Sequence, residues 1–157
     1  IFFAVATGEQ RSRGIELDIA GEILPGWNII TNYAYTDAEI TEEEDGNEGN
    51  RLTGVPENNF NLWTTYDIQS GPLEGLGFGL GFNYVSERFG DVANSFTADD
   101  YFLTNTAVSY KRDYWQAALN IRNLFDINYI ESAGRTRTLG ISPGEGFTLV
   151  GSFSIEF

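Results

Sequence analysis

Glu16 and Asp18 are two carboxylates that could do chemistry together. They lie two positions apart in a segment that alternates polar and apolar residues, so both side chains point to the same face of a strand. Paired carboxylates can act as general acid and general base. The chain contains no His and no Cys, however, which removes the common catalytic triads and the usual transition-metal ligands. We interpret the pair as part of a polar wall, and we predict no catalytic residues, no metal site, no cofactor and no enzyme activity.

A second candidate for chemistry is the acidic segment EEEDGNEGN at residues 42–50. Its carboxylates could bind calcium, but the segment lacks the order of acidic residues before the glycine that an EF-hand loop requires. It also lacks the closing Glu. We therefore interpret it as a solvent-exposed acidic loop.

The overall charge excludes one class of partner. The chain has 23 acidic and 9 basic residues, which gives a formal net charge of −14. Nucleic-acid binding needs a basic surface, so we predict no nucleic-acid partner. The chain begins with Ile1 and contains no Met, which suggests a fragment or a mature product of a longer protein. No apolar run approaches the roughly 20 residues of a membrane helix.

The elements that must position these residues are strands, because period-two alternation repeats along nearly the whole chain. Seven segments show it: residues 3–21, 27–38, 58–68, 75–88, 101–111, 114–124 and 146–157. Residues 75–88 are the clearest, with Leu76, Phe78 and Leu80 alternating with glycines. Residues 3–21 could form one long strand or two.

The connections alternate in length, and this pattern favours a membrane barrel. Three are short (22–26, 69–74 and 112–113), and three are long, polar and rich in glycine (39–57, 89–100 and 125–145). Aromatic residues fall on the apolar face in two groups. One group, near the short turns, consists of Trp27, Tyr66, Tyr110, Trp115 and Phe157. The other group, toward the long loops, consists of Tyr33, Tyr35, Phe60, Tyr84, Phe102, Phe125 and Phe147. Two aromatic belts with asymmetric loops are typical of bacterial outer-membrane barrels. A soluble β-sandwich also alternates, but it has no reason to sort Trp and Tyr by height.

The basic residues cluster at the long-loop end. Six of the nine lie there: Arg11, Arg13, Arg51, Arg88, Arg135 and Arg137. Three interpretations remain open, namely contact with lipopolysaccharide phosphates, contact with an anionic cargo, and pairing with nearby carboxylates.

Several motifs appear in the order expected of one family. They are TGEQRSRGIELDIAG (7–21), YAYTDAEI (33–40), VPENNFNLWTTYD (55–67), LNIRNLFDINYI (119–130) and the terminal strand ending at Phe157. Together they resemble the C-terminal barrel region of TonB-dependent siderophore receptors. One departure is the segment SPGEGFT (142–148), which lacks the Arg that the family often carries at the start of the last strand.

The resemblance implies an all-β fold. Residues 1–157 would be an antiparallel transmembrane β-barrel segment of about seven strands, the C-terminal portion of a larger barrel of about 22 strands. The plug domain would be absent from this chain. The location would be the outer membrane of a Gram-negative-type bacterium.

The function implied is energy-coupled uptake of ferric siderophores. The partners would be a ferric siderophore, outer-membrane lipid and lipopolysaccharide, the TonB coupling protein through the missing N-terminal part, and the barrel assembly machinery. The alternative is a passive or structural barrel without a plug, similar to a porin. Binding residues concentrate on loops, so we predict ligand contacts at Tyr129, Arg135 and Arg137. By family resemblance, Phe157 would be the assembly signal.

Overall fold

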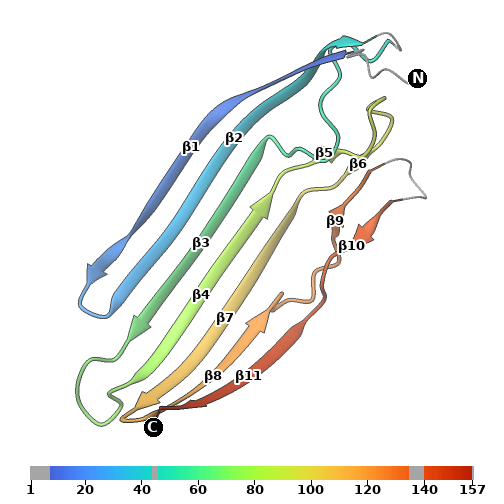
Figure 1. Cartoon of the computed structure of the whole chain (residues 1–157). Helices are drawn as coiled ribbons and strands as arrows, with labels where there is room; N and C mark the ends of the chain where they lie inside the picture. Colours follow the sequence, from blue (N-terminus) through green and yellow to red (C-terminus); the bar gives the residue numbers. More distant parts are fainter. Residues whose placement is uncertain (1–7, 44–45, 135–139, 157) are drawn as a thin grey trace, which may run out of the picture.

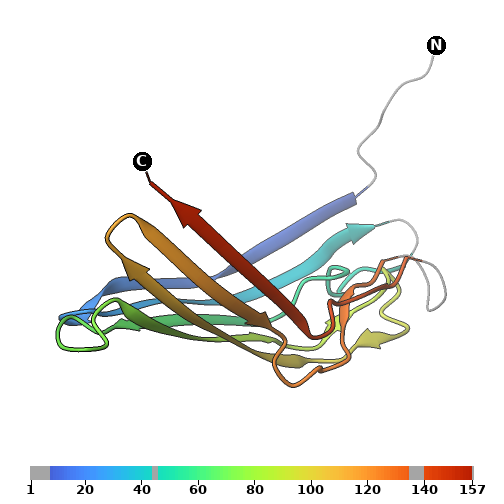
Figure 2. The same ribbon diagram turned by 90° about the horizontal axis from the view of Figure 1, so that it is seen from below.

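The chain folds into one large antiparallel sheet. A computed structural model describes residues 8–43, 46–134 and 140–156, and seven strands form its main sheet (Figure 1). Their order is β1 (Gly8–Leu24), β2 (Trp27–Glu43), β3 (Asn58–Asp67), β4 (Leu76–Val85), β7 (Tyr101–Arg112), β8 (Trp115–Arg122) and β11 (Thr148–Ile155). Each long strand pairs with the next one along the chain, and the sheet curves into an open trough (Figure 2). The predicted all-β antiparallel fold and its seven long strands are confirmed.

The strand register gathers the apolar residues on one face, which we call the outer face. Tyr33 pairs with Phe60, Phe60 with Tyr84, and Tyr84 with Phe102, so an aromatic row crosses four strands near the long loops. A second aromatic row, near the short turns, joins Trp27, Tyr66 and Phe78. The ring centroids of Tyr110 and Trp115 lie 5.5 Å apart, and those of Trp115 and Phe153 lie 5.9 Å apart. The two predicted belts are confirmed on the strands, while Phe125 and Phe147 are exposed residues just outside them.

Several predicted boundaries were wrong. The first strand continues through residues 22–24, because Leu24 pairs with Trp27 across a turn at Pro25 and Gly26. The second strand continues to Glu43, five residues beyond its predicted end. The second extension contains Glu39, a charged residue that the alternation pattern discounts. Glu39 lies opposite Arg11 and forms an ion pair with it, and opposite charges in register stabilise a strand. The predicted start of the first strand at residue 3 and the terminal residue Phe157 lie outside the described residues.

Two of the predicted long loops contain short hairpins. β5 (Arg88–Phe89) pairs with β6 (Thr97–Ala98), and β9 (Ile130–Ser132) pairs with β10 (Ser142–Pro143). The predicted strand 75–88 therefore ends early, at Val85. Pairs this short leave little trace in hydrophobic periodicity, so the sequence did not reveal them.

A buried apolar cluster lies among the loops. Phe96, Ala98 and Ala133 form a buried cluster, and Ile130 packs against it. The sheet itself exposes both faces in this chain, which explains why its largest apolar side chains are exposed. Among the described residues, no helix is long and apolar enough to cross a membrane.

The connection between β3 and β4 provides a matched test of turn geometry. Gly71 and Gly75 both have φ of +88°, but a Cβ at Gly75 would collide with the carbonyl oxygen of Lys111 on β7, whereas a Cβ at Gly71 would meet nothing within 4 Å. Gly71→Ala should therefore lower the free energy of unfolding by only about 1 kcal/mol, which is the cost of a left-handed backbone conformation for a residue with a Cβ. Gly75→Ala should cost about 2 kcal/mol or more, because the backbone must also shift. Urea unfolding of the two variants in the full-length protein measures the difference, and equal costs would contradict the contact with β7.

Candidate functional site

A ladder of asparagines crosses the inner face of the sheet, opposite the apolar face. The Asn105 amide donates to Asn83 Oδ1 at 2.7 Å, and Asn83 in turn donates to Asn61 Oδ1. Asn61 donates to Asn32 Oδ1 at 2.9 Å, and the backbone N–H of Asn123 donates to Asn105 Oδ1 at 2.9 Å. An Asn side chain carries both a donor and an acceptor, so one residue type can continue the ladder from strand to strand. The result is a polar inner wall whose amides are held in a fixed direction.

Trp63 is the large exception on this polar face. It pairs with Gly81 across β3 and β4, and a Cβ added at Gly79 would lie 2.6 Å from its ring. The predicted inward glycines of β4 are confirmed, and their missing side chains are what allow an indole to lie against the sheet. Trp63 was not predicted on this face, although the alternation along β3 places it on the same side as Asn61 and Thr65.

The inner face also carries the charged residues that were predicted there. Glu16 is opposite Ala34 and Asp18 is opposite Asn32, so both carboxylates lie on the polar side of β1. Arg122 also lies on this face and pairs with Glu145 at 3.1 Å. Within residues 8–43, 46–134 and 140–156, no group of three or more His, Cys, Asp and Glu residues could hold a metal ion. The arrangement is that of a hydrated wall that can bind polar groups.

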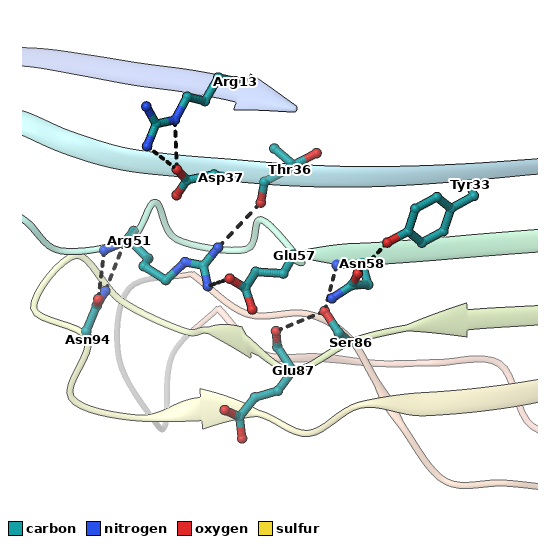
Figure 3. A network of polar contacts seen from close by, with 10 residues as sticks. All are labelled: Arg13, Tyr33, Thr36, Asp37, Arg51, Glu57, Asn58, Ser86, Glu87 and Asn94. Atoms are coloured by element: carbon teal, nitrogen blue, oxygen red, sulfur yellow. Dashed lines mark hydrogen bonds and ion pairs between the residues drawn. The ribbon is translucent and has the colours of Figure 1, made fainter. Parts of the chain in front are cut away.

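The first two long loops are hydrogen-bonded into one layer above the sheet. The Asn94 side chain binds the Arg51 backbone on both sides: its Oδ1 accepts from Arg51 N at 2.8 Å, and its Nδ2 donates to Arg51 O at 2.9 Å (Figure 3). The Asn50 amide donates to Val92 O at 3.0 Å, and Gly54 N donates to Phe89 O at 2.8 Å. These contacts connect segments about 40 residues apart, so the two loops are held as a unit.

Arg88 connects this layer to the third long loop. Its side chain is 4% exposed, and Nη2 donates to the carbonyl oxygens of Ile130 and, at 3.0 Å, Glu131. The guanidinium carbon lies 5.4 Å from the centre of the Tyr101 ring, within the range of a cation–π contact. Nη1 is buried, with no acceptor among the described residues. The sequence placed Arg88 at the loop end but gave no sign that it is buried.

Tyr129, a predicted ligand contact, packs within this layer. Its ring centroid lies 4.4 Å from that of Tyr101, and a Cβ at Gly144 would overlap the Tyr129 ring. The side chain is half-buried, so part of it is still accessible. Arg135 and Arg137, the other two predicted contacts, lie outside the described residues, as does Phe157.

Two cavities lie among the loops. One of about 440 Å³ is lined by Asn47, Thr53, Asp91, Val92, Ala93 and Gly134. The other, of about 270 Å³, is lined by Arg51, Val55, Glu57, Ser86, Glu87, Arg88 and Phe89. In the first cavity the Ser95 hydroxyl and backbone N–H donate to Asp91, and these bonds lower the pKa of its carboxyl. This cavity therefore keeps a negative charge at neutral pH.

The chain is similar in sequence to known proteins. The family model described as TonB dependent receptor-like, beta-barrel matches residues 1–124. The ferrichrome outer membrane transporter/phage receptor of Escherichia coli K12 is 36% identical over 140 residues, which cover 86% of this chain and 19% of the relative. The metal-pseudopaline receptor CntO of Pseudomonas aeruginosa is 33% identical over 152 residues, which cover 96% of this chain and 21% of the relative.

Solved structures of receptors have a fold similar to that of this chain. The siderophore receptor PiuA from Acinetobacter baumannii superposes with a TM-score of 0.83 at 31% identity, over 94% of this chain and 22% of that structure. The ferric yersiniabactin uptake receptor FyuA from Yersinia pestis superposes with a TM-score of 0.85 over 96% of this chain and 24% of that structure; at 21% identity, it supports the fold alone. The chain spans about a fifth of the length of the curated relatives it matches.

Proposed function

Because this chain belongs to the TonB-dependent receptor-like β-barrel family, we propose that it forms the C-terminal part of an outer-membrane receptor that takes up ferric siderophores. The observation that carries the proposal is the division of one curved sheet into an apolar outer face with two aromatic rows and an amide-lined inner face beneath a loop layer. This division suits strands that separate lipid from a polar interior. The outer face lies against outer-membrane lipid.

We propose that the loop layer is the part of the receptor that faces the cargo. Several relatives are named as siderophore receptors, among them the ferrioxamine B receptor of Salmonella typhimurium, which is 32% identical over 128 residues. We propose that Tyr129, Arg135 and Arg137 contact the ferric siderophore from the third long loop. Support for Tyr129 comes from its half-buried ring on a rigid support, since a held aromatic loses little entropy on binding.

The remaining partners follow from the family. We propose that the TonB protein acts through the part of the receptor that this chain does not contain, and that the barrel assembly machinery recognises the terminal strand through Phe157. Binding and gated passage need no catalytic residue, so the proposed receptor is not an enzyme.

Uptake in cells tests the proposal directly. The full-length receptor should restore accumulation of radiolabelled iron, given as ferrichrome or ferrioxamine B, to an iron-starved strain that lacks its own receptors. Deleting the TonB gene or dissipating the proton gradient should abolish the uptake. A passive or porin-like barrel would instead give uptake that is unaffected by either treatment, and that result would overturn the proposal.

A further inference from the structure

We propose that Asn123 is a positioning residue for Tyr129, the side chain on the third long loop that we propose as a cargo contact. Asn123 holds the base of this loop closed and fixes it to the polar inner wall of the sheet. The inference rests on the proposed function, because it concerns how the cargo contact is held in place.

Asn123 is a buried polar residue whose side-chain hydrogen-bonding groups are all used. It follows the last residue of β8, is 2% exposed, and has φ of +48°. Its Nδ2 donates to Ile127 O at 2.9 Å and to Glu145 O at 3.0 Å. Its Oδ1 accepts from Ile127 N at 2.8 Å. Both amide N–H groups and the amide oxygen are therefore engaged within the described part of the chain.

The Asn123 side chain joins the two arms of the third long loop at their base. Ile127 lies on the arm that leaves β8, and Glu145 lies on the arm that returns to the neighbouring strand β11 (Figure 1). One residue before Glu145, the backbone N–H of Gly144 donates to Tyr129 O at 2.8 Å. Asn123 thus holds the residue two positions before Tyr129 and the residue next to Gly144. The backbone of Tyr129 is therefore fixed from both arms.

The position of this backbone decides the position of the Tyr129 ring. The ring lies against Gly144, because a Cβ added there would overlap its atoms. It also lies beside Tyr101 of β7, with the ring centroids 4.4 Å apart. The ring contacts both the returning arm and a strand of the sheet, so its place depends on the two arms staying together. A ring held in this way loses little conformational entropy when cargo binds.

Asn123 is also the junction between the third long loop and the ladder of asparagines on the inner face. Its backbone N–H donates to Asn105 Oδ1 at 2.9 Å. A backbone N–H can only donate, so Asn105 must turn its oxygen toward Asn123 and its amide N–H groups toward Asn83. The direction of the ladder is therefore set at Asn123. The base of the loop is fixed to β7 and, through the ladder, to β4.

Removal of the Asn123 side chain tests the proposal in the full-length receptor. Asn123→Gly is the suitable variant, because glycine adopts the same left-handed backbone without strain. We expect it to weaken binding of ferrichrome and of ferrioxamine B about tenfold, because Tyr129 must then be ordered as the cargo binds. Asp113→Gly is the matched control: Asp113 has φ of +49° in the turn before β8, and its replacement should leave both affinities unchanged.

A double-mutant cycle separates positioning from general support of the fold. If Asn123 acts through Tyr129, Asn123→Gly should change the affinity little in a receptor that already carries Tyr129→Ala. A purely structural role would give the same loss of affinity in both backgrounds, and that result would overturn the proposal.

Hydrogen exchange gives a readout that does not depend on cargo. In the Asn123→Gly variant the amides of Ile127 and Gly144 should exchange faster, whereas those of β4 should keep their protection. Unchanged exchange at Gly144 would overturn the proposal even in a receptor that imports siderophores normally. If the unaltered receptor imports no siderophore, the proposed function fails instead, and exchange at Gly144 still decides whether Asn123 holds Tyr129.

Discussion

Replacing Leu119 by Arg should destabilise the full-length barrel by about 2–4 kcal/mol. Leu119 lies on the outer face of β8, in register with Val108 on one side and Gly151 on the other. It is four residues from Trp115, which lies beside the short turn between β7 and β8. Leu119 is therefore about 13 Å along the strand from that rim and near the middle of the hydrocarbon band. A guanidinium at this depth must lose its hydration or deform the bilayer.

Asn120 provides the matched control, because it is the next residue on the same strand and faces the opposite way. It pairs with Ala107 and Val150 on the inner face, which is the polar face of the sheet. Asn120→Arg should therefore cost well under 1 kcal/mol. Urea-dependent folding of the two variants into lipid vesicles gives the comparison. If the two penalties were the same, our assignment of the two faces would be wrong.

Replacing Arg88 by Met should open the loop layer while leaving the sheet folded. The change removes hydrogen bonds to the carbonyl oxygens of Ile130 and Glu131 and the contact with Tyr101. Each buried carbonyl left without a donor costs about 1–3 kcal/mol, so the layer should lose about 2–5 kcal/mol. Tyr129, which we propose as a siderophore contact, packs on Tyr101, so on that proposal the expected functional result is weaker siderophore binding with normal insertion in the membrane.

Hydrogen exchange separates this local effect from global unfolding. In the Met variant, amides of residues 130–132 should exchange faster, while those of β7 and β8 should keep their protection. Arg88→Lys should be intermediate, because an ammonium keeps the cation–π contact and can donate to a carbonyl but lacks the planar fork. Uniform loss of protection across the sheet would show that Arg88 supports the barrel as a whole and not the loops.

Much of the fold was predictable because its main signal is local. Alternation with period two assigns each residue of a strand to a face, so Leu80, Leu119 and Phe153 could be placed on the apolar side from the sequence. The alternation of short and long connections then predicted antiparallel neighbours. The far end of β2 could not be predicted this way, since Glu39 continues the strand opposite Arg11 on β1.

The loop layer and the inner face show what only the tertiary structure decided. The sequence contains many inward asparagines, but the register alone decides that Asn61 bonds both Asn32 and Asn83. In the sequence, Arg88 is one of six arginines predicted at the long-loop end. Only the structure shows that the third long loop brings Ile130, 42 residues further along the chain, beside it. The period of the hydrophobic pattern depends only on neighbours within one strand. These contacts depend instead on which separate segments lie next to one another, and that is set by packing and register across the whole sheet.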